Sequence, residues 1–144
     1  MKNFLWLATA SALAAPLAAM AADHHNPLVA ERWKTRPVVV VVPTRDDALL
    51  RKVESALQKS ATREAFLDRE MVLYTVAAGE GRRNHKRLAP SQTRALLTAL
   101  QLDAAGPSTF VLVGKDGGVK MTEGADVDLG AVFAEIDRMP MRRR

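Results

Sequence analysis

The pattern of apolar and polar residues predicts four strands. Residues 38–42 are consecutive valines, too apolar to alternate and too rich in β-branched side chains to favour a helix, so they predict a strand buried on both faces. Residues 71–76 predict a second buried strand. Residues 110–113 and 119–122 predict two more, and an Asp-Gly pair within 114–118 predicts the tight turn that makes them an antiparallel hairpin.

Helical spacing of apolar residues predicts three helices. The first has Thr44 as its expected N-cap and runs to about Ser60, with an apolar face formed by Leu49, Leu50, Val53, Ala56 and Leu57. The second helix opens at Pro90, and the third covers about 127–139. The polar stretch before residue 71 predicts a connection without regular structure, and the Gly- and Arg-rich residues 77–89 predict a long loop.

The order of these elements predicts an α/β fold. Strand, helix, strand, helix, strand, strand, helix is the order of the thioredoxin-like core, a four-stranded mixed sheet with helices on both faces. Residues 37–144 are expected to form this domain, and residues 23–36 lack periodicity and predict an N-terminal arm that Trp33 anchors. Because many unrelated activities share this order, it predicts a fold and no chemistry.

Residues 1–22 have the three-part pattern of a secretory signal peptide. Lys2 precedes an apolar stretch at 4–17, and residues 19–21 supply the small side chains that a signal peptidase requires. The stretch falls short of the roughly 20 residues of a membrane-spanning helix. We therefore expect cleavage near Ala22, a mature chain without a membrane span, and a periplasmic or secreted location.

Composition and charge narrow the chemistry. The 144-residue chain contains no cysteine, which excludes disulfides, thiol nucleophiles and thiolate metal sites. Its formal net charge is +5, and the positive residues include a group in one predicted loop, Arg82, Arg83, Lys86 and Arg87. Such a group can attract polyanions, and it also fits an ordinary solvated loop, so both interpretations stay open. Expected export and few aromatic residues argue against nucleic acid as the partner.

Four segments taken together resemble a known family. They are NPL at 26–28 with RWK at 32–34, DREMVLY at 68–74, GKDGGVK at 114–120, and IDRMPMRR at 136–143. These segments look like the peroxiredoxin-like domain of unknown function called P-DUDES, or domain of unknown function 4174. That domain occurs in short bacterial secreted proteins and in vertebrate extracellular matrix proteins of the equarin and sushi-repeat type. The resemblance covers nearly all of the expected mature chain. It implies a thioredoxin-like fold in an exported protein, from a family without a settled activity.

The junction of the first strand and first helix is the first candidate site. In thioredoxin-like enzymes the reactive cysteine lies there, because the helix N-terminus lowers the pKa of a thiol. Here residues 43–47 read PTRDD, so thiol-disulfide exchange and thiol-based peroxide reduction are excluded. The resemblance implies that Pro107 faces this junction, where such folds often carry a cis-proline. An ordinary trans-proline after a helix is the alternative.

Two residues of the junction, Thr44 and Arg45, are candidates for further chemistry. Thr44 as a nucleophile needs a base such as histidine nearby, and a helix cap is the simpler interpretation. Arg45 with helix amides can bind a small anion, although the negative charges of Asp46 and Asp47 oppose it.

The expected new N-terminus holds a speculative metal site. Cleavage after Ala21 leaves Ala22-Asp23-His24, and the amine, two amides and imidazole of such a sequence can bind copper(II) or nickel(II) in a square plane. Cleavage one residue later removes the site, and a polar arm without a metal is the alternative.

These observations favour an exported, noncatalytic binding or scaffolding domain without a cofactor. The binding residues are expected in the predicted basic loop and at the junction, with Thr44, Arg45 and Pro107. The expected partner is an extracytoplasmic protein. Two alternatives stay open: a binder of lipopolysaccharide or another acidic polymer, and a cysteine-independent oxidoreductase or hydrolase whose groups meet only in the folded chain.

Overall fold

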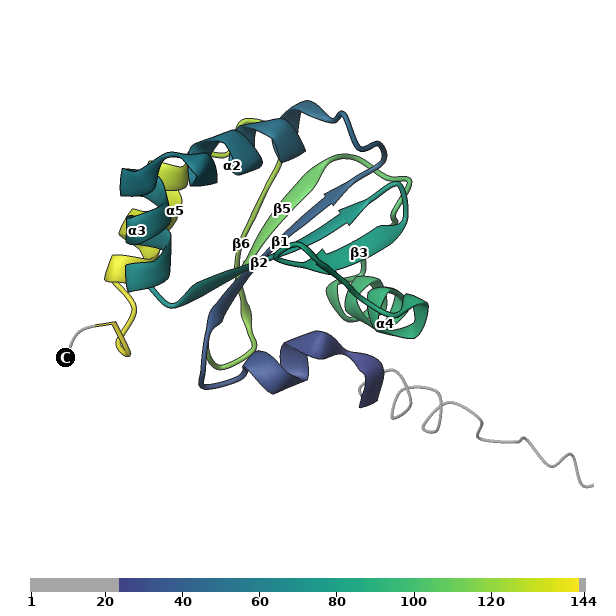
Figure 1. The fold of residues 1–144 in the computed structure, drawn as a ribbon. Helices are drawn as coiled ribbons and strands as arrows, with labels where there is room; N and C mark the ends of the chain where they lie inside the picture. Colours follow the sequence, from purple (N-terminus) through teal and green to yellow (C-terminus); the bar gives the residue numbers. More distant parts are fainter. Residues whose placement is uncertain (1–23, 143–144) are drawn as a thin grey trace, which may run out of the picture.

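The computed structural model describes residues 24–142, so the predicted signal peptide lies outside the described residues. The elements follow one another around a central sheet (Figure 1). They are η1 (Pro27–Glu31), β1 (Arg36–Val42), α2 (Ala48–Gln58), α3 (Ser60–Asp68), β2 (Met71–Ala77), β3 (Glu80–Arg83), β4 (Lys86–Arg87), α4 (Pro90–Leu100), β5 (Thr109–Val113), β6 (Val119–Glu123) and α5 (Leu129–Asp137). Every helix within 24–142 is too short or too polar to cross a bilayer.

The sheet is mixed and has six strands in the order β4-β3-β2-β1-β5-β6. β1 pairs with β2 in parallel, and all other neighbours are antiparallel. The α/β class, the four predicted strands and the predicted hairpin of β5 and β6 are confirmed. The predicted strand number of four is wrong, because β3 and β4 extend the sheet beyond β2.

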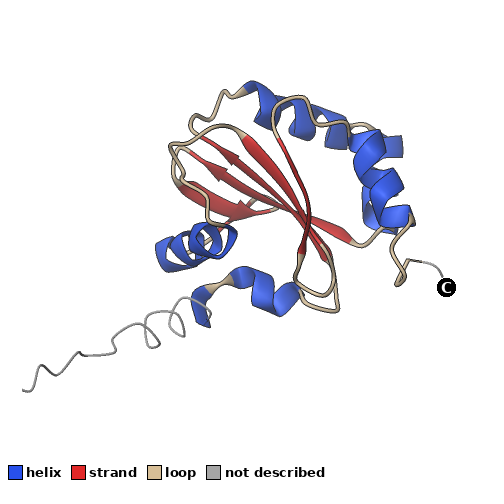
Figure 2. Cartoon of the chain, turned by 180° about the vertical axis from the view of Figure 1, so that it is seen from behind, coloured by secondary structure: helices blue, strands red, loops and turns tan. Residues whose placement is uncertain are grey.

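Helices cover both faces of the sheet, as predicted (Figures 1 and 2). Helices α2, α3 and α5 pack on one face, over Val38, Val40 and Val42 of β1. Helix α4 and η1 pack on the other face, over Val39 and Val41. All seven residues of β1 are buried, which is the physical basis of its uninterrupted valines.

The expected loop at 77–89 folds into the hairpins that carry β3 and β4. Ala78 and Gly79 connect β2 to β3 with φ of 50° and 77°, which matches the two-residue turn that joins twisted antiparallel strands. The prediction failed because Ala-Gly is not a usual turn pair and because arginines occupy strand positions that face solvent.

Gly81 of β3 allows this hairpin to lie close against α4. A Cβ atom at Gly81 would come within 2.2 Å of Oγ1 of Thr93, a buried residue of α4. A side chain at this position would force Thr93 to shift, so the glycine allows the close approach of the helix to the added strands.

Two further predictions in this region are wrong. The polar connection before β2 is helix α3, which buries only Phe66 and so lacks the broad apolar face that marks a helix in a sequence. Helix α2 is capped by Asp47, whose Oδ1 accepts from the backbone N–H of Leu49 at 2.9 Å, and not by Thr44. Asp47 replaces Thr44 because the chain continues for several residues beyond β1 before it turns into the helix.

The N-terminal arm is held by residues other than Trp33. Leu28 and Glu31 of η1 are buried, whereas the side chain of Trp33 is 67% exposed, so the prediction of a tryptophan anchor is wrong. Trp33 has a φ of 65°, and its backbone N–H donates to the carbonyl of Lys115 at 2.7 Å. Trp33 belongs to neither cluster of core residues. The division into arm and domain at residue 36 stays a prediction.

Candidate functional site

The β1–α2 junction lies against the segment that precedes β5. Oγ of Ser108 donates to Oδ2 of Asp47 at 2.6 Å, so the residue after Pro107 is tied directly to the cap of α2. Thr44 and Pro107 are both exposed. All peptide bonds of the described residues are trans, so the trans alternative for Pro107 is the one found.

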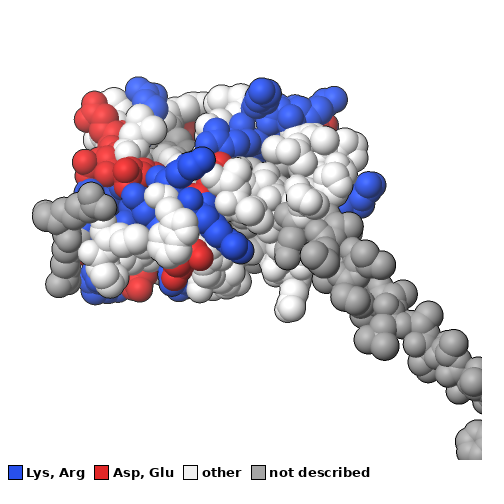
Figure 3. Space-filling model, turned by 90° about the horizontal axis from the view of Figure 1, so that it is seen from below, with Lys and Arg blue, Asp and Glu red and all other residues white. Residues whose placement is uncertain are grey.

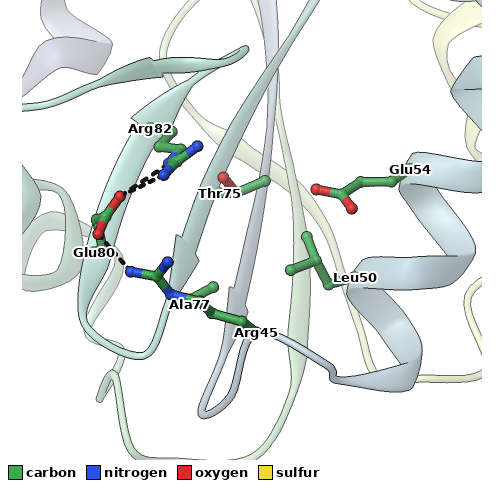
Figure 4. Close-up of a pocket in the computed structure, with 7 residues that line it drawn as sticks. All are labelled: Arg45, Leu50, Glu54, Thr75, Ala77, Glu80 and Arg82. Carbon is green, nitrogen blue, oxygen red and sulfur yellow. Dashed lines mark hydrogen bonds and ion pairs between the residues drawn. The ribbon is translucent and has the colours of Figure 1, made fainter.

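A carboxylate at the same end of the sheet brings three arginines together. Glu80 begins β3 and accepts from Arg45 of the junction at 2.6 Å. Its other oxygen, Oε1, accepts from Arg82 at 2.7 Å and lies 3.2 Å from Nε of Arg87. Figure 4 shows Arg45 and Arg82 reaching Glu80 from a loop and a strand that are far apart in sequence. We call Glu80, Arg45, Arg82 and Arg87 the Glu80 cluster.

The Glu80 cluster is a positively charged surface. The hydrogen bond from Arg82 lowers the pKa of Glu80, with smaller contributions from the charges of Arg87 and Arg45. Glu80 is therefore ionised at neutral pH, and three guanidinium groups around one carboxylate leave an excess of two positive charges. The side chains of Arg45 and Arg87 are 64% and 70% exposed, so most of this charge faces solvent.

A small cavity adjoins the cluster. Its volume is about 160 Å³, and α2, β2 and β3 contribute its walls. Figure 4 shows Glu54 of α2 on the side of the cavity opposite Glu80, with Thr75 between them. A ligand group that enters there meets both the arginines and a second carboxylate.

The four basic residues of the predicted loop divide between the two faces of the sheet. Arg82 pairs with Arg87 across β3 and β4, and both lie on the face of the Glu80 cluster. Arg83 pairs with Lys86 on the opposite face. Because successive side chains of a strand point in opposite directions, the predicted basic patch is not one surface.

Arg83 belongs to a hydrogen-bond network around the buried Glu31 that the sequence did not reveal. Nε of Arg83 and the hydroxyl of Tyr74 both donate to Oε1 of Glu31, at 2.6 and 2.8 Å. Oγ1 of Thr35 donates to Oε2 of the same carboxylate at 2.6 Å. We call these four residues the Glu31 network. It joins η1 to β2 and β3, so it holds the N-terminal arm on the domain.

The network changes the acidity of its members. Burial by itself raises the pKa of Glu31, but hydrogen bonds from Arg83, Thr35 and Tyr74 outweigh burial and lower it. Burial and the neighbouring Glu31 carboxylate raise the pKa of Tyr74 well above its ordinary value. Glu31 is thus ionised and Tyr74 is neutral at physiological pH. A lone Glu in an aperiodic segment gave no sequence signal for this arrangement.

The histidines do not assemble a site within residues 24–142. His24, His25 and His85 are exposed, and no group of three or more metal-binding side chains occurs in this part of the chain. The speculative copper or nickel site at His24 also needs Ala22 and Asp23, which lie outside the described residues, so it stays untested.

A family model matches most of the chain. Residues 27–144 match the model described as "Domain of unknown function (DUF4174)". The chain belongs to the DUF4174 family. Comparison with curated proteins and with solved structures gave no match.

The family assignment agrees with the resemblance noted in the sequence and adds no chemistry. This DUF4174 chain has no cysteine, so its β1–α2 junction cannot carry out thiol chemistry. Among the described residues the junction presents instead an exposed threonine, an arginine and a helix-capping aspartate, of which Arg45 joins the Glu80 cluster.

Proposed function

We propose that this DUF4174 chain is an exported, noncatalytic binding domain with a thioredoxin-like core. Four neighbouring strands, β2-β1-β5-β6, support the core, because one parallel pair followed by two antiparallel pairs is the expected pattern for that order of elements. The signal-peptide pattern of residues 1–22 supports export to the periplasm or the exterior.

The Glu80 cluster carries the binding proposal. Exposed guanidinium groups from the junction and the hairpin meet there, on loops and a short strand fixed by the sheet. Arginine binds carboxylates through planar, bidentate hydrogen bonds, so the cluster is suited to binding acidic side chains.

The expected partner is an extracytoplasmic protein that presents a short acidic segment. A long polyanion needs a continuous row of positive charges, and here Arg83 and Lys86 lie on the opposite face from Arg82 and Arg87. Arg83 is also committed to Glu31. The division of the basic residues therefore favours a compact acidic partner over lipopolysaccharide or a similar polymer.

An enzymatic role has less support. Glu80 is held ionised by three arginines, which makes it a poor proton donor near neutral pH. The described histidines lie outside the cavity beside it.

A pull-down with matched variants tests the proposal. The exported form of the chain is immobilised and exposed to extracytoplasmic extract of its organism, then washed at low and high salt. Arg82→Gln with Arg87→Gln removes two charges from the cluster. Arg63→Gln with Arg94→Gln removes two exposed arginines from helices α3 and α4 and serves as the control.

The proposal expects a discrete protein that the wild type and the control retain at low salt and that the Arg82/Arg87 variant loses, with weaker retention at high salt because the arginines are exposed. Capture of anionic polymer alone, released at high salt, would instead support the alternative that the chain binds a polyanion. Equal retention by all three proteins would overturn the assignment of the Glu80 cluster.

A further inference from the structure

A second candidate site lies at the opposite end of β1, where Arg36 is buried. The side chain of Arg36 is 1% exposed. Its Nη1 donates to the backbone oxygen of Arg69 at 2.9 Å and lies 3.7 Å from Oε2 of Glu70. Its Nε and Nη2 are also buried, and neither has a hydrogen-bond partner among the described residues. Because a guanidinium stays charged in proteins, two charged donors remain unsatisfied.

The two unsatisfied nitrogens form one edge of the guanidinium. The N–H bonds of Nε and Nη2 point in parallel from that edge, which is the geometry that binds both oxygens of a carboxylate. Nη1 is already engaged by protein groups. Arg36 therefore retains the part of its side chain that is best suited to an oxyanion.

Arg36 lines two cavities at this end of the molecule, of about 480 and 440 Å³. The two cavities share Trp33, Lys115 and Met141 in their walls, so they adjoin one another. Trp33 and Met141 are 67% and 41% exposed, which gives the opening an apolar rim. An exposed tryptophan in a left-handed backbone conformation is costly for folding alone and is typical of a binding surface.

The remaining cations of these cavities are already paired. Lys115 pairs with Glu70, Lys120 with Asp116, Arg138 with Glu135, and Arg142 with Asp68. Figure 3 shows this end of the molecule, where basic and acidic side chains lie intermixed. Five cations and four carboxylates line the two cavities, so one positive charge is in excess. Arg36 is the buried member of this set.

We propose that Arg36 and Trp33 bind a small carboxylate ligand with an aromatic or aliphatic body. The carboxylate pairs with the Nε–Nη2 edge of Arg36, and the body packs on the indole of Trp33 and on Met141. The two nitrogens are closed to solvent, so entry requires a side chain of the wall to move. Met141 is suited to this, since an unbranched methionine changes rotamer easily and lies at the rim.

Calorimetry with a model ligand tests the site. The experiment uses a Trp6→Phe variant, in which Trp33 is the single tryptophan. Its fluorescence therefore reports on the rim of the site. The probes are 3-phenylpropionate, its neutral analogue 3-phenylpropanol, and inorganic phosphate. We expect 3-phenylpropionate to bind at least tenfold more tightly than either of the others and to change the emission of Trp33.

Two variants separate binding from folding. Arg36→Met removes the unsatisfied charge and keeps an apolar chain of similar length, so it should fold and should lose at least tenfold in affinity. Arg63→Met, which changes an exposed arginine of α3, is the control and should bind as the parent does.

Four outcomes would overturn the proposal. Three are equal affinity for 3-phenylpropanol, undiminished affinity in Arg36→Met, and no binding of 3-phenylpropionate at all. The fourth is tighter binding of inorganic phosphate than of 3-phenylpropionate, which would show that the site binds a different oxyanion rather than a carboxylate.

Discussion

Removal of the Glu31 carboxylate gives the sharpest test of how the arm is held on the domain. Glu31→Ala deletes the acceptor of three hydrogen bonds, which come from the buried Tyr74, the half-buried Thr35 and the partly exposed Arg83. Hydrogen bonds to a charged group contribute about 1.5–3 kcal/mol each. The side chain of Arg83 is 43% exposed, so that pair adds only about 0.2–1 kcal/mol.

Part of this total is offset because burying the carboxylate is itself unfavourable. We therefore expect Glu31→Ala to lower the free energy of unfolding by about 2–4 kcal/mol. For a domain of this size the loss corresponds to a fall in Tm of roughly 6–20 °C. Urea unfolding followed by circular dichroism measures it. Glu64→Ala, at an exposed position of α3, is the control and should change stability by less than about 0.5 kcal/mol.

A double-mutant cycle with Tyr74→Phe shows whether the carboxylate acts through the tyrosine. The two losses should be less than additive by about 1–2 kcal/mol, because each single change breaks the same hydrogen bond. A loss below about 1 kcal/mol in Glu31→Ala would refute the reasoning. Strict additivity with Tyr74→Phe would show that the hydroxyl and the carboxylate do not interact.

Three further predictions follow from described contacts. The pKa of Glu31 is lowered in the folded chain, so its contribution to stability is complete above the ordinary value of 4.5 and should fall as the pH drops below that value. Acid unfolding of the wild type and of Glu31→Gln should therefore show that the difference in stability between them shrinks at low pH. Tyr74 is the single tyrosine and its pKa is raised, so absorbance titration should show tyrosinate only as the chain unfolds in base; ionisation of the folded chain near pH 10 would contradict the burial. Gly81→Ala should cost about 1–3 kcal/mol through its clash with Thr93, and Thr93→Ala should recover part of that loss. Gly124→Ala has room for its methyl group and is the control, and equal effects of the two alanines would rule out the clash.

The buried part of the fold was predictable because its apolar residues leave clear patterns. A run of five valines has no polar face, so it predicts a strand buried on both sides. This run correctly predicted the position of β1. The β5–β6 hairpin was equally clear from its Asp-Gly turn. In contrast, α3 and the β3–β4 hairpin bury few apolar side chains, so the apolar pattern of the sequence does not mark their positions.

The candidate sites were less predictable than the fold. Arg45 and the arginines of 77–89 were singled out from the sequence, but their meeting at Glu80 depends on the unpredicted β3. Trp33 was predicted to anchor the N-terminal arm, and this was wrong because a sequence does not show a positive φ. Arg36 was missed, since one arginine before a valine run is indistinguishable from an exposed strand end.

The length of β1 separates the two proposed binding sites by a fixed distance. Arg36 is its first residue, and the junction with Arg45 follows its last, Val42. A strand of seven residues spans about 20 Å at roughly 3.3 Å per residue. This is more than twice the Debye length of about 8 Å at physiological ionic strength. An anion bound at one end therefore exerts almost no repulsion on an anion arriving at the other, and the two sites should fill independently.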